Sequence, residues 1–182
     1  MWVGSAQTRL IVVRGNSGSG KSSIAMGLRS SCECRIAWVS QDLIRRTILK
    51  EQDRPGAANI HLIDQVARYS LNHGYHVVLD GILRADRHEE MLAGLRRDHG
   101  GHSFFYYLEV SLAETLRRHA GRLQAAEFGP DDMRSWFRPM DLLSAVKEQV
   151  IPESSSLQHT IARILADSGL VRSWRDLPAS AG

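Results

Sequence analysis

The eight residues from Gly15 to Ser22 constrain this chain more than any other stretch. They read Gly-Asn-Ser-Gly-Ser-Gly-Lys-Ser and fit the pattern G-x-x-x-x-G-K-[ST] without a mismatch. The apolar run Leu10–Val13 before them has the composition of a buried strand, and Ser23–Ser31 after them carries apolar residues at helical spacing. A strand, a glycine-rich turn and a helix in this order predict a loop that binds phosphate groups. A turn that binds nothing is the alternative, which the Lys-Ser pair and both flanking elements disfavour.

The residue types of this loop match the parts of a nucleoside triphosphate. Glycines let backbone N–H groups converge on phosphate oxygens, and the N-terminus of the following helix adds positive potential. We expect Lys21 to reach the β- and γ-phosphates and the Ser22 hydroxyl to ligate Mg²⁺. The residues expected to bind the nucleotide are Gly15, Asn16, Ser17, Gly18, Ser19, Gly20, Lys21, Ser22 and Ser23.

The composition is that of an ordinary globular protein. Its 182 residues suffice for a single domain, expected over residues 1–182, and the net charge of +3 comes without a dense basic stripe, which disfavours nucleic acid as a partner. The longest apolar runs span four or five residues and no signal peptide is visible, so we expect a cytoplasmic protein with no membrane partner. Cys32 and Cys34 form a lone C-x-C motif, which we expect to remain as two reduced thiols.

Apolar runs and helical periodicity predict strands and helices that alternate along the chain. After the first strand and helix, the expected strands cover 36–39, 76–81, 103–110 and 149–152, and the expected helices cover 43–49, 59–72, 86–98, 112–123, 133–137 and 157–165. Asn59 is the predicted N-cap of one helix, and Met1–Thr8 is expected to be a loose terminus. The alternation predicts an α/β protein, in which a parallel sheet has helices on both faces.

Two aspartates follow predicted strands and are the candidates for chemistry. Ligands of such sheets bind beyond the carboxyl ends of the strands, so Asp42 and Asp80 should share one crevice with Gly15–Ser22. We expect Asp42 to accept the proton of a substrate hydroxyl, although an aspartate before an apolar helix is also a common N-cap, and both roles are compatible. Asp80 is expected to bind Mg²⁺; its alternatives are a turn residue in the Asp-Gly pair and a substrate contact.

Arginines flank the irregular segment that breaks the pattern after residue 123. We expect a helical lid over about 113–141, and Arg118 and Arg122, four residues apart on one helix face, are expected to stabilise the charge of a transferred phosphoryl group. A solvated helix face that pairs with Glu114 is the alternative. Further side chains are candidates for an acceptor pocket or for ordinary helix surface and packing, namely Arg45, Arg46, Arg84, Asp64, His61, Phe128, Trp136 and Phe137.

With these residues in place, the chain resembles the small P-loop kinases over about Leu10 to Leu165. The motifs that carry the resemblance are Gly15–Ser22, Ser40–Asp42, Val77–Gly81 and Glu114–His119. It is most similar to the branch of chloramphenicol phosphotransferase-like and zeta-toxin-like enzymes, with gluconate kinase and adenylylsulfate kinase as cousins. The resemblance implies a three-layer P-loop NTPase fold with a five-stranded parallel sheet and a helical lid. It also implies ATP with Mg²⁺ as cofactors, lid arginines that assist, and Asp42 as the base.

These features favour an ATP-dependent kinase that moves the γ-phosphoryl group to a hydroxyl of a small molecule, either an antibiotic or a metabolite. No segment after Asp42 or Asp80 matches a substrate signature, so the acceptor is left open, as are the oligomeric state and the choice between ATP and GTP. A kinase of nucleotides or nucleic-acid ends is one alternative, which predicts saturable binding of nucleoside monophosphates or 5′-hydroxyl ends. A nucleotide-dependent binding switch is another, which predicts nucleotide consumption stimulated by a protein partner.

Overall fold

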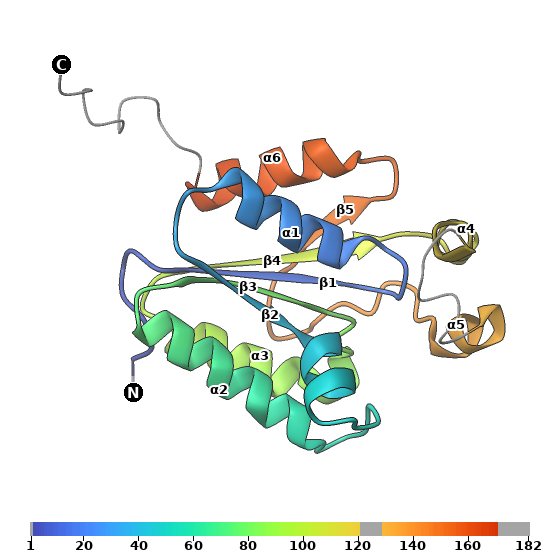
Figure 1. Cartoon of the computed structure of the whole chain (residues 1–182), viewed down its shortest axis with the longest axis horizontal. Coiled ribbons are helices and arrows are strands. Elements are labelled where there is room, and N and C mark those ends of the chain that lie inside the picture. Colours follow the sequence, from blue (N-terminus) through green and yellow to red (C-terminus); the bar gives the residue numbers. More distant parts are fainter. Residues whose placement is uncertain (1, 121–128, 171–182) are drawn as a thin grey trace.

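The computed structural model describes residues 2–120 and 129–170, and its centre is a five-stranded parallel sheet with the strand order β2-β3-β1-β4-β5 (Figure 1). The strands are β1 (Arg9–Gly15), β2 (Ile36–Ser40), β3 (His76–Gly81), β4 (His102–Glu109) and β5 (Gln149–Pro152). The helices are α1 (Lys21–Ser31), the π-helix η1 (Leu43–Ile48), α2 (Ala58–Asn72), α3 (Ala85–Asp98), α4 (Leu112–Ala120), α5 (Pro130–Trp136) and α6 (Leu157–Ser168). The predicted parallel sheet is confirmed.

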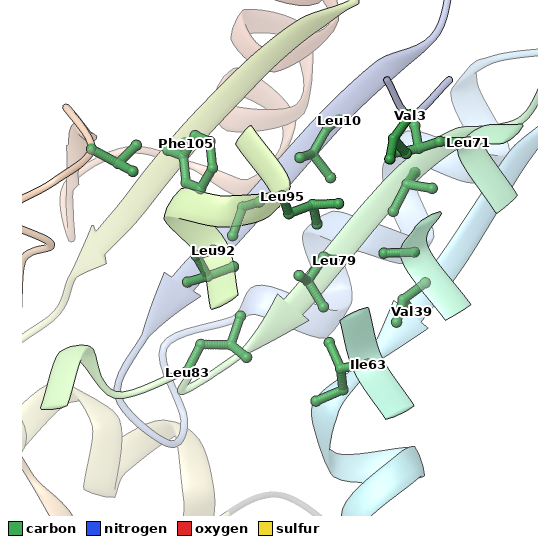
Figure 2. Packing of buried hydrophobic residues seen from close by; sticks show 14 of the residues in the cluster. Val3, Leu10, Val39, Ile63, Leu71, Leu79, Leu83, Leu92, Leu95 and Phe105 are labelled. Carbon is green, nitrogen blue, oxygen red and sulfur yellow. The ribbon is translucent and has the colours of Figure 1, made fainter. Parts of the chain in front are cut away.

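Helices cover both faces of this sheet, α1 and α6 on one side and α2 and α3 on the other (Figure 1). Because side chains along a strand alternate between the two faces of the sheet, the apolar residues of β1 contribute to the hydrophobic cores on both faces. Leu10 and Val12 pack on the side of α2 and α3, and Ile11 and Val13 pack on the side of α1 and α6. Figure 2 shows the first core, where Leu10 lies among side chains of the neighbouring strands and of α3. The central strand is thereby buried on both faces, and the loop that follows it is held at one edge.

The N-terminal segment is ordered by contacts with the end of α3, so the expectation of a loose terminus was wrong for residues 2–8. Val3 is buried and forms a parallel bridge with His99, and its N–H donates to the carbonyl of Asp98 at 2.8 Å. The Thr8 hydroxyl lies 2.9 Å from Nε2 of the same histidine. These contacts join positions about ninety residues apart, which no local pattern indicates.

The Glu51 carboxylate, from the loop that precedes α2, caps the N-terminus of this helix in place of the predicted Asn59 cap. Ala57 is the N-cap, and Asn59 lies buried inside the helix. Glu51 accepts hydrogen bonds from the Asn59 side chain at 3.0 Å and from the backbone N–H groups of Ala58 and Asn59 at 2.8 and 2.9 Å. These bonds, led by that from the Asn59 side chain, lower the pKa of Glu51. The Glu51 carboxylate thus accepts hydrogen bonds from N–H groups at the start of α2, which a cap residue next to the helix would otherwise accept.

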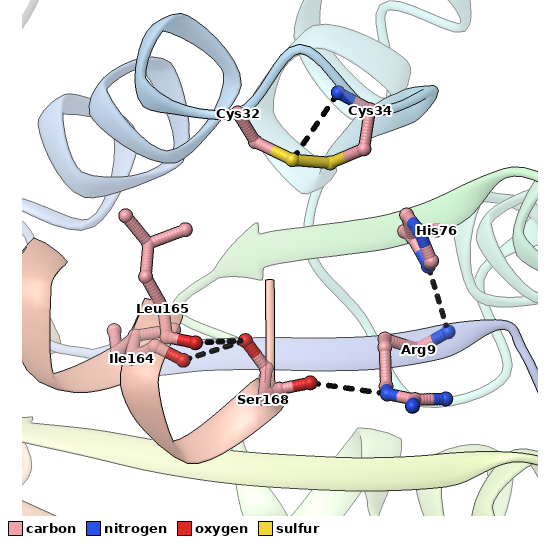
Figure 3. The surroundings of a disulfide bond; sticks show 7 residues. All are labelled: Arg9, Cys32, Cys34, His76, Ile164, Leu165 and Ser168. Atoms are coloured by element: carbon pink, nitrogen blue, oxygen red, sulfur yellow. Dashed lines mark hydrogen bonds between the residues drawn. A yellow bond between two sulfur atoms is a disulfide. The ribbon is translucent and has the colours of Figure 1, made fainter. Parts of the chain in front are cut away.

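Cys32 and Cys34 form a disulfide between α1 and β2, and the expectation of two reduced thiols was wrong (Figure 3). Both cysteines precede β2, which begins only at Ile36. The chain turns before the strand, and the two Cα atoms lie 5.1 Å apart, within the range for a disulfide. Across the described residues, every helix is too short or too polar to cross a membrane.

Candidate active site

Three glycines give the loop Gly15–Ser22 its shape. Gly15, Gly18 and Gly20 have φ angles of 147°, 81° and 104°, which residues other than glycine rarely adopt. A Cβ atom added at Gly18 would lie 2.8 Å from the carbonyl oxygen of Thr115 in α4. The loop therefore turns sharply at the carboxyl end of β1 and packs closely against the start of the predicted lid.

Lys21 is the first residue of α1, and its side chain folds back over the loop. Its Nζ donates to the carbonyl oxygen of Asn16 at 2.7 Å and lies 3.4 Å from the Ser19 hydroxyl. The residue is buried, so its charge acts in a sheltered place at the N-terminus of α1. A cation and a helix N-terminus that converge on one loop form a site for a polyphosphate.

Asp80 at the end of β3 lies against the loop and is oriented by two donors. The Ser22 hydroxyl donates to Asp80 Oδ2 at 2.8 Å, and the Trp38 indole donates to Oδ1 at 2.6 Å. Mg²⁺ prefers oxygen ligands and is commonly held by one or two protein groups together with phosphates and water. A hydroxyl and a carboxylate in direct contact beside a phosphate loop fit that ion.

Asp42 lies between the end of β2 and the π-helix η1, and two arginines contact its carboxylate. Its Oδ1 is 3.2 Å from Arg45 Nη2 and 3.4 Å from Arg46 Nε, and 64% of the side chain is exposed. Within the described part of the chain, the carboxylate makes no capping hydrogen bond to the helix. The capping alternative is therefore not observed, and the role as a base stays a prediction.

One cavity of about 1070 Å³ joins these groups. Eight of the predicted site residues line it, namely Ser17, Gly18, Gly20, Lys21, Ser22, Ser23, Asp42 and Asp80. Gly15, Asn16 and Ser19 are described but lie outside the lining, and Asn16 and Ser19 are buried. The ends of three adjacent strands, β2, β3 and β1, thus deliver their carboxylates and the phosphate loop to the same space.

The helices of the predicted lid, α4 and α5, lie beyond the carboxyl edge of the sheet, apart from the two helical layers (Figure 1). Arg118 contacts the phosphate loop, because its Nη1 donates to the Ser19 carbonyl at 3.1 Å, while its Nε donates to Glu114 at 2.6 Å. Glu114 also accepts from Arg117, and the bonds from Arg117 and Arg118 lower its pKa to about 2. Arg122 and Phe128 lie outside the described residues.

The predicted acceptor residues divide between the cavity and other places. Arg45, Arg46, Arg84 and Trp136 line the cavity. Asp64 instead pairs with Arg68 at 2.8 Å on α2, and His61 is exposed. Sequence reasoning missed further lining residues, namely Lys50, Asp53, Arg87 and His119. Lys50 and Asp53 lie between the predicted helices 43–49 and 59–72, where no periodicity reveals which way a side chain points.

Sequence reasoning also missed a buried polar network behind the loop. Arg14 is fully buried on β1, and its guanidinium donates to Glu148 at 2.7 Å, to Asp141 at 3.2 Å and to the Leu83 carbonyl. The Asn16 amide exchanges two hydrogen bonds with the backbone of Arg138, at 2.8 and 2.9 Å. The signal in the sequence was a charged residue inside an otherwise apolar strand. The network ties the phosphate loop to the segment that follows α5.

The family follows from a comparison of the sequence with family models. The model of the AAA domain family matches residues 10–139, a span that holds the loop, both aspartates and Arg118. The chain belongs to the AAA domain family. No curated protein matches this AAA domain chain in sequence. The closer branch suggested by the motifs therefore stays a prediction.

Solved structures similar to this AAA domain include small kinases. A gluconokinase from Sinorhizobium meliloti 1021 has a TM-score of 0.61 and 18% identity, with 91% of this chain and 93% of that chain covered. The APS kinase of Mycobacterium tuberculosis in complex with AMPPNP and APS has a TM-score of 0.62 and 19% identity, with 95% and 100% covered. The tunicamycin resistance protein of Deinococcus radiodurans has a TM-score of 0.58 and 16% identity, with 89% and 96% covered. At these identities the likeness establishes the shared P-loop kinase fold.

Proposed function

We propose that this AAA domain protein is a kinase that transfers the γ-phosphoryl group of ATP to a hydroxyl of a small molecule. The observation that carries the proposal is the single cavity lined by Lys21, Ser22, Asp80 and Asp42. A phosphate loop alone serves many nucleotide-binding proteins, whereas a further carboxylate across the same cavity suits activation of an acceptor. Kinase names among the similar structures support this choice.

The phosphate end of the cavity binds and orients ATP. The loop amides and Lys21 hold the phosphate oxygens, and Ser22 with Asp80 would hold Mg²⁺, which when bound neutralises charge on the β- and γ-phosphates. Trp38 fixes the Asp80 carboxylate by its indole hydrogen bond. Trp38 on β2 therefore orients the Asp80 carboxylate of the adjacent strand β3, which would hold Mg²⁺.

Asp42 acts at the other end of the cavity. Its carboxylate takes the proton of the acceptor hydroxyl while the hydroxyl oxygen attacks the γ-phosphorus. The new O–P bond forms as the bond from the γ-phosphorus to the bridging oxygen breaks, and ADP leaves with that electron pair. Arg118, with Arg122 as a second lid arginine, stabilises the charge that develops on the transferred group.

The test is a search for phosphorylated product. The protein is incubated with ATP, Mg²⁺ and a panel of sugars, polyols and hydroxyl-bearing antibiotics, and products are identified by mass spectrometry. We expect one class of alcohol to gain a phosphoryl group and to stimulate ADP formation, and the Lys21→Ala variant to yield none. Tight nucleotide binding without stimulation by any alcohol, but with stimulation by a protein, would instead favour a switch.

A further inference from the structure

We propose that the acceptor of this kinase is an anion: a small molecule that carries a carboxylate, phosphate or sulfate group beside the hydroxyl that is phosphorylated. This inference rests on the proposed kinase function and names its substrate class. Its basis is a set of cationic side chains on the cavity wall, namely Arg45, Arg46, Lys50, Arg84 and Arg87. None of them belongs to the phosphate loop.

These cations gather on the side of the cavity that holds Asp42. Arg45, Arg46 and Lys50 come from η1 and the residues after it, and Arg84 and Arg87 come from the start of α3. The strand order β2-β3-β1 places both of these elements on the same side of the phosphate loop. Once ATP occupies the loop, the space that remains beside these cations is the space for the acceptor.

The charge of this region is positive and partly sheltered from water. The side chains of Arg45, Arg84 and Arg87 are only 16%, 19% and 17% exposed. Besides Asp80 at the phosphate end, three carboxylates line the cavity, on Asp42, Glu51 and Asp53, against five cations. Sheltered guanidinium groups bind carboxylate, phosphate and sulfate oxygens through short, charge-assisted hydrogen bonds. The cavity wall therefore favours an anion over a neutral alcohol.

The wall carboxylates offset only part of this charge. Glu51 is engaged outside the wall as the cap of α2, whereas Asp53 pairs with Arg87 at 2.9 Å and Asp42 with Arg45 and Arg46. Arg84 pairs with Asp86 at the start of α3. The Nε of Arg87 is buried and finds no hydrogen-bond acceptor among the residues that the structure describes. A buried donor without an acceptor costs free energy, which an anionic ligand within reach relieves.

The contacts of Asp42 explain why an anion would also promote the reaction. Arg45 and Arg46 both contact its Oδ1, so in this state the proposed base is held by two cations. An acceptor anion that binds these guanidinium groups displaces the carboxylate, which leaves Asp42 available to contact the acceptor hydroxyl. A neutral alcohol leaves the carboxylate held. The transfer step stays as above, with the hydroxyl proton on Asp42 and ADP as the leaving group.

The test compares matched neutral and anionic probes on the full chain. The protein is saturated with Mg²⁺ and AMPPNP, and calorimetry measures binding of glycerol against glycerol 3-phosphate and of glucose against gluconate. We expect at least one anionic probe to bind about tenfold or more tightly than its neutral partner. Arg46→Gln and Arg84→Gln should each remove about tenfold of that affinity. Arg97→Gln, on the 76% exposed side chain of the same α3 helix, should not change it.

Three results would overturn the acceptor class: equal binding of neutral and anionic partners, no binding of either anion at millimolar concentration, or an unchanged preference in both arginine variants. Unchanged AMPPNP affinity and melting temperature show that the variants are folded. If AMPPNP itself does not bind, the proposed kinase function fails. If AMPPNP binds and a neutral alcohol is phosphorylated as well as its anionic partner, only the acceptor class fails.

Discussion

Asp80 and its two donors show what a sequence does and does not reveal about single residues. The run Val77–Leu79 followed by Asp80 predicted a carboxylate at a strand end, and the structure places it there. Its partner Trp38 was not predicted, because the contact crosses from β2 to β3 and depends on their register, in which Ser40 faces Asp80. Local patterns locate the carboxylate, whereas its orientation depends on which strands are neighbours.

Asp42 illustrates the same division, because its position was predictable and its environment was not. The sequence placed it after a strand and near the phosphate loop, and the cavity joins the two. Its contacts with Arg45 and Arg46, three and four positions further on, were not predicted, although this spacing brings side chains together on an ordinary helix as well. A π-helix follows where an ordinary helix was expected. π-Helical turns occur often at functional sites.

His99 makes stability depend on pH. Burial lowers its pKa from 6.5 to about 4, with smaller contributions from Arg9 and His102, and it contacts Thr8 and Ser103 at 2.9 Å. The unfolded chain therefore binds the proton first, so the free energy of unfolding should fall as the pH drops from 6.5 towards 4, by about 3 kcal/mol. Urea unfolding at several pH values measures this change.

The His99→Gln variant serves as the comparison for that measurement, and His61→Gln, at an exposed position on α2, serves as its control. We expect the acid-dependent loss to shrink in the first variant and to persist in the second. An equal loss in wild type and His99→Gln would contradict the assignment.

At the scale of elements, boundaries set by abrupt changes of residue type were predictable. Strands 76–81 and 149–152 match the prediction, because apolar runs there end in Asp-Gly and at a proline. The cap of α2 comes from Glu51 in the preceding loop, and Val3 contacts His99 far along the chain, so no pattern within either segment predicts these contacts. Within the described residues, the segment predicted as a lid contains α4 and α5, and its role as a lid stays a prediction.

The link between the phosphate loop and the segment after α5 yields a prediction. Asn16→Ala removes both hydrogen bonds to the Arg138 backbone and leaves those groups without partners. We expect a loss of about 1–3 kcal/mol in the free energy of unfolding and severalfold weaker AMPPNP binding, because the loop is less well held. Urea unfolding and calorimetry measure both quantities.

Ser135→Ala is the matched control, since its hydroxyl bonds only locally to the Asp132 carbonyl on α5 among the described residues. It should leave nucleotide affinity unchanged. If the Asn16→Ala variant keeps the stability and the AMPPNP affinity of wild type, the phosphate loop does not depend on this link.

At the scale of the whole molecule, the layer architecture was predictable and the internal polar network was not. Alternating strands and helices predicted a parallel sheet covered on both faces, as observed. The strand order became visible only in three dimensions, and so did the reason for Arg14 inside an apolar strand. Its bonds to Glu148 and Asp141 join β1 to a segment more than a hundred residues away.

The central claim is that three neighbouring strand ends place ATP, its magnesium ligands and a base in one cavity. Asp42→Asn tests it most directly, in a single-turnover measurement with Mg²⁺, ATP and the alcohol that gives most product with wild type. The account predicts unchanged ATP affinity and a transfer rate lower by about a hundredfold or more, because the amide cannot take the hydroxyl proton. A transfer rate equal to that of wild type would contradict it.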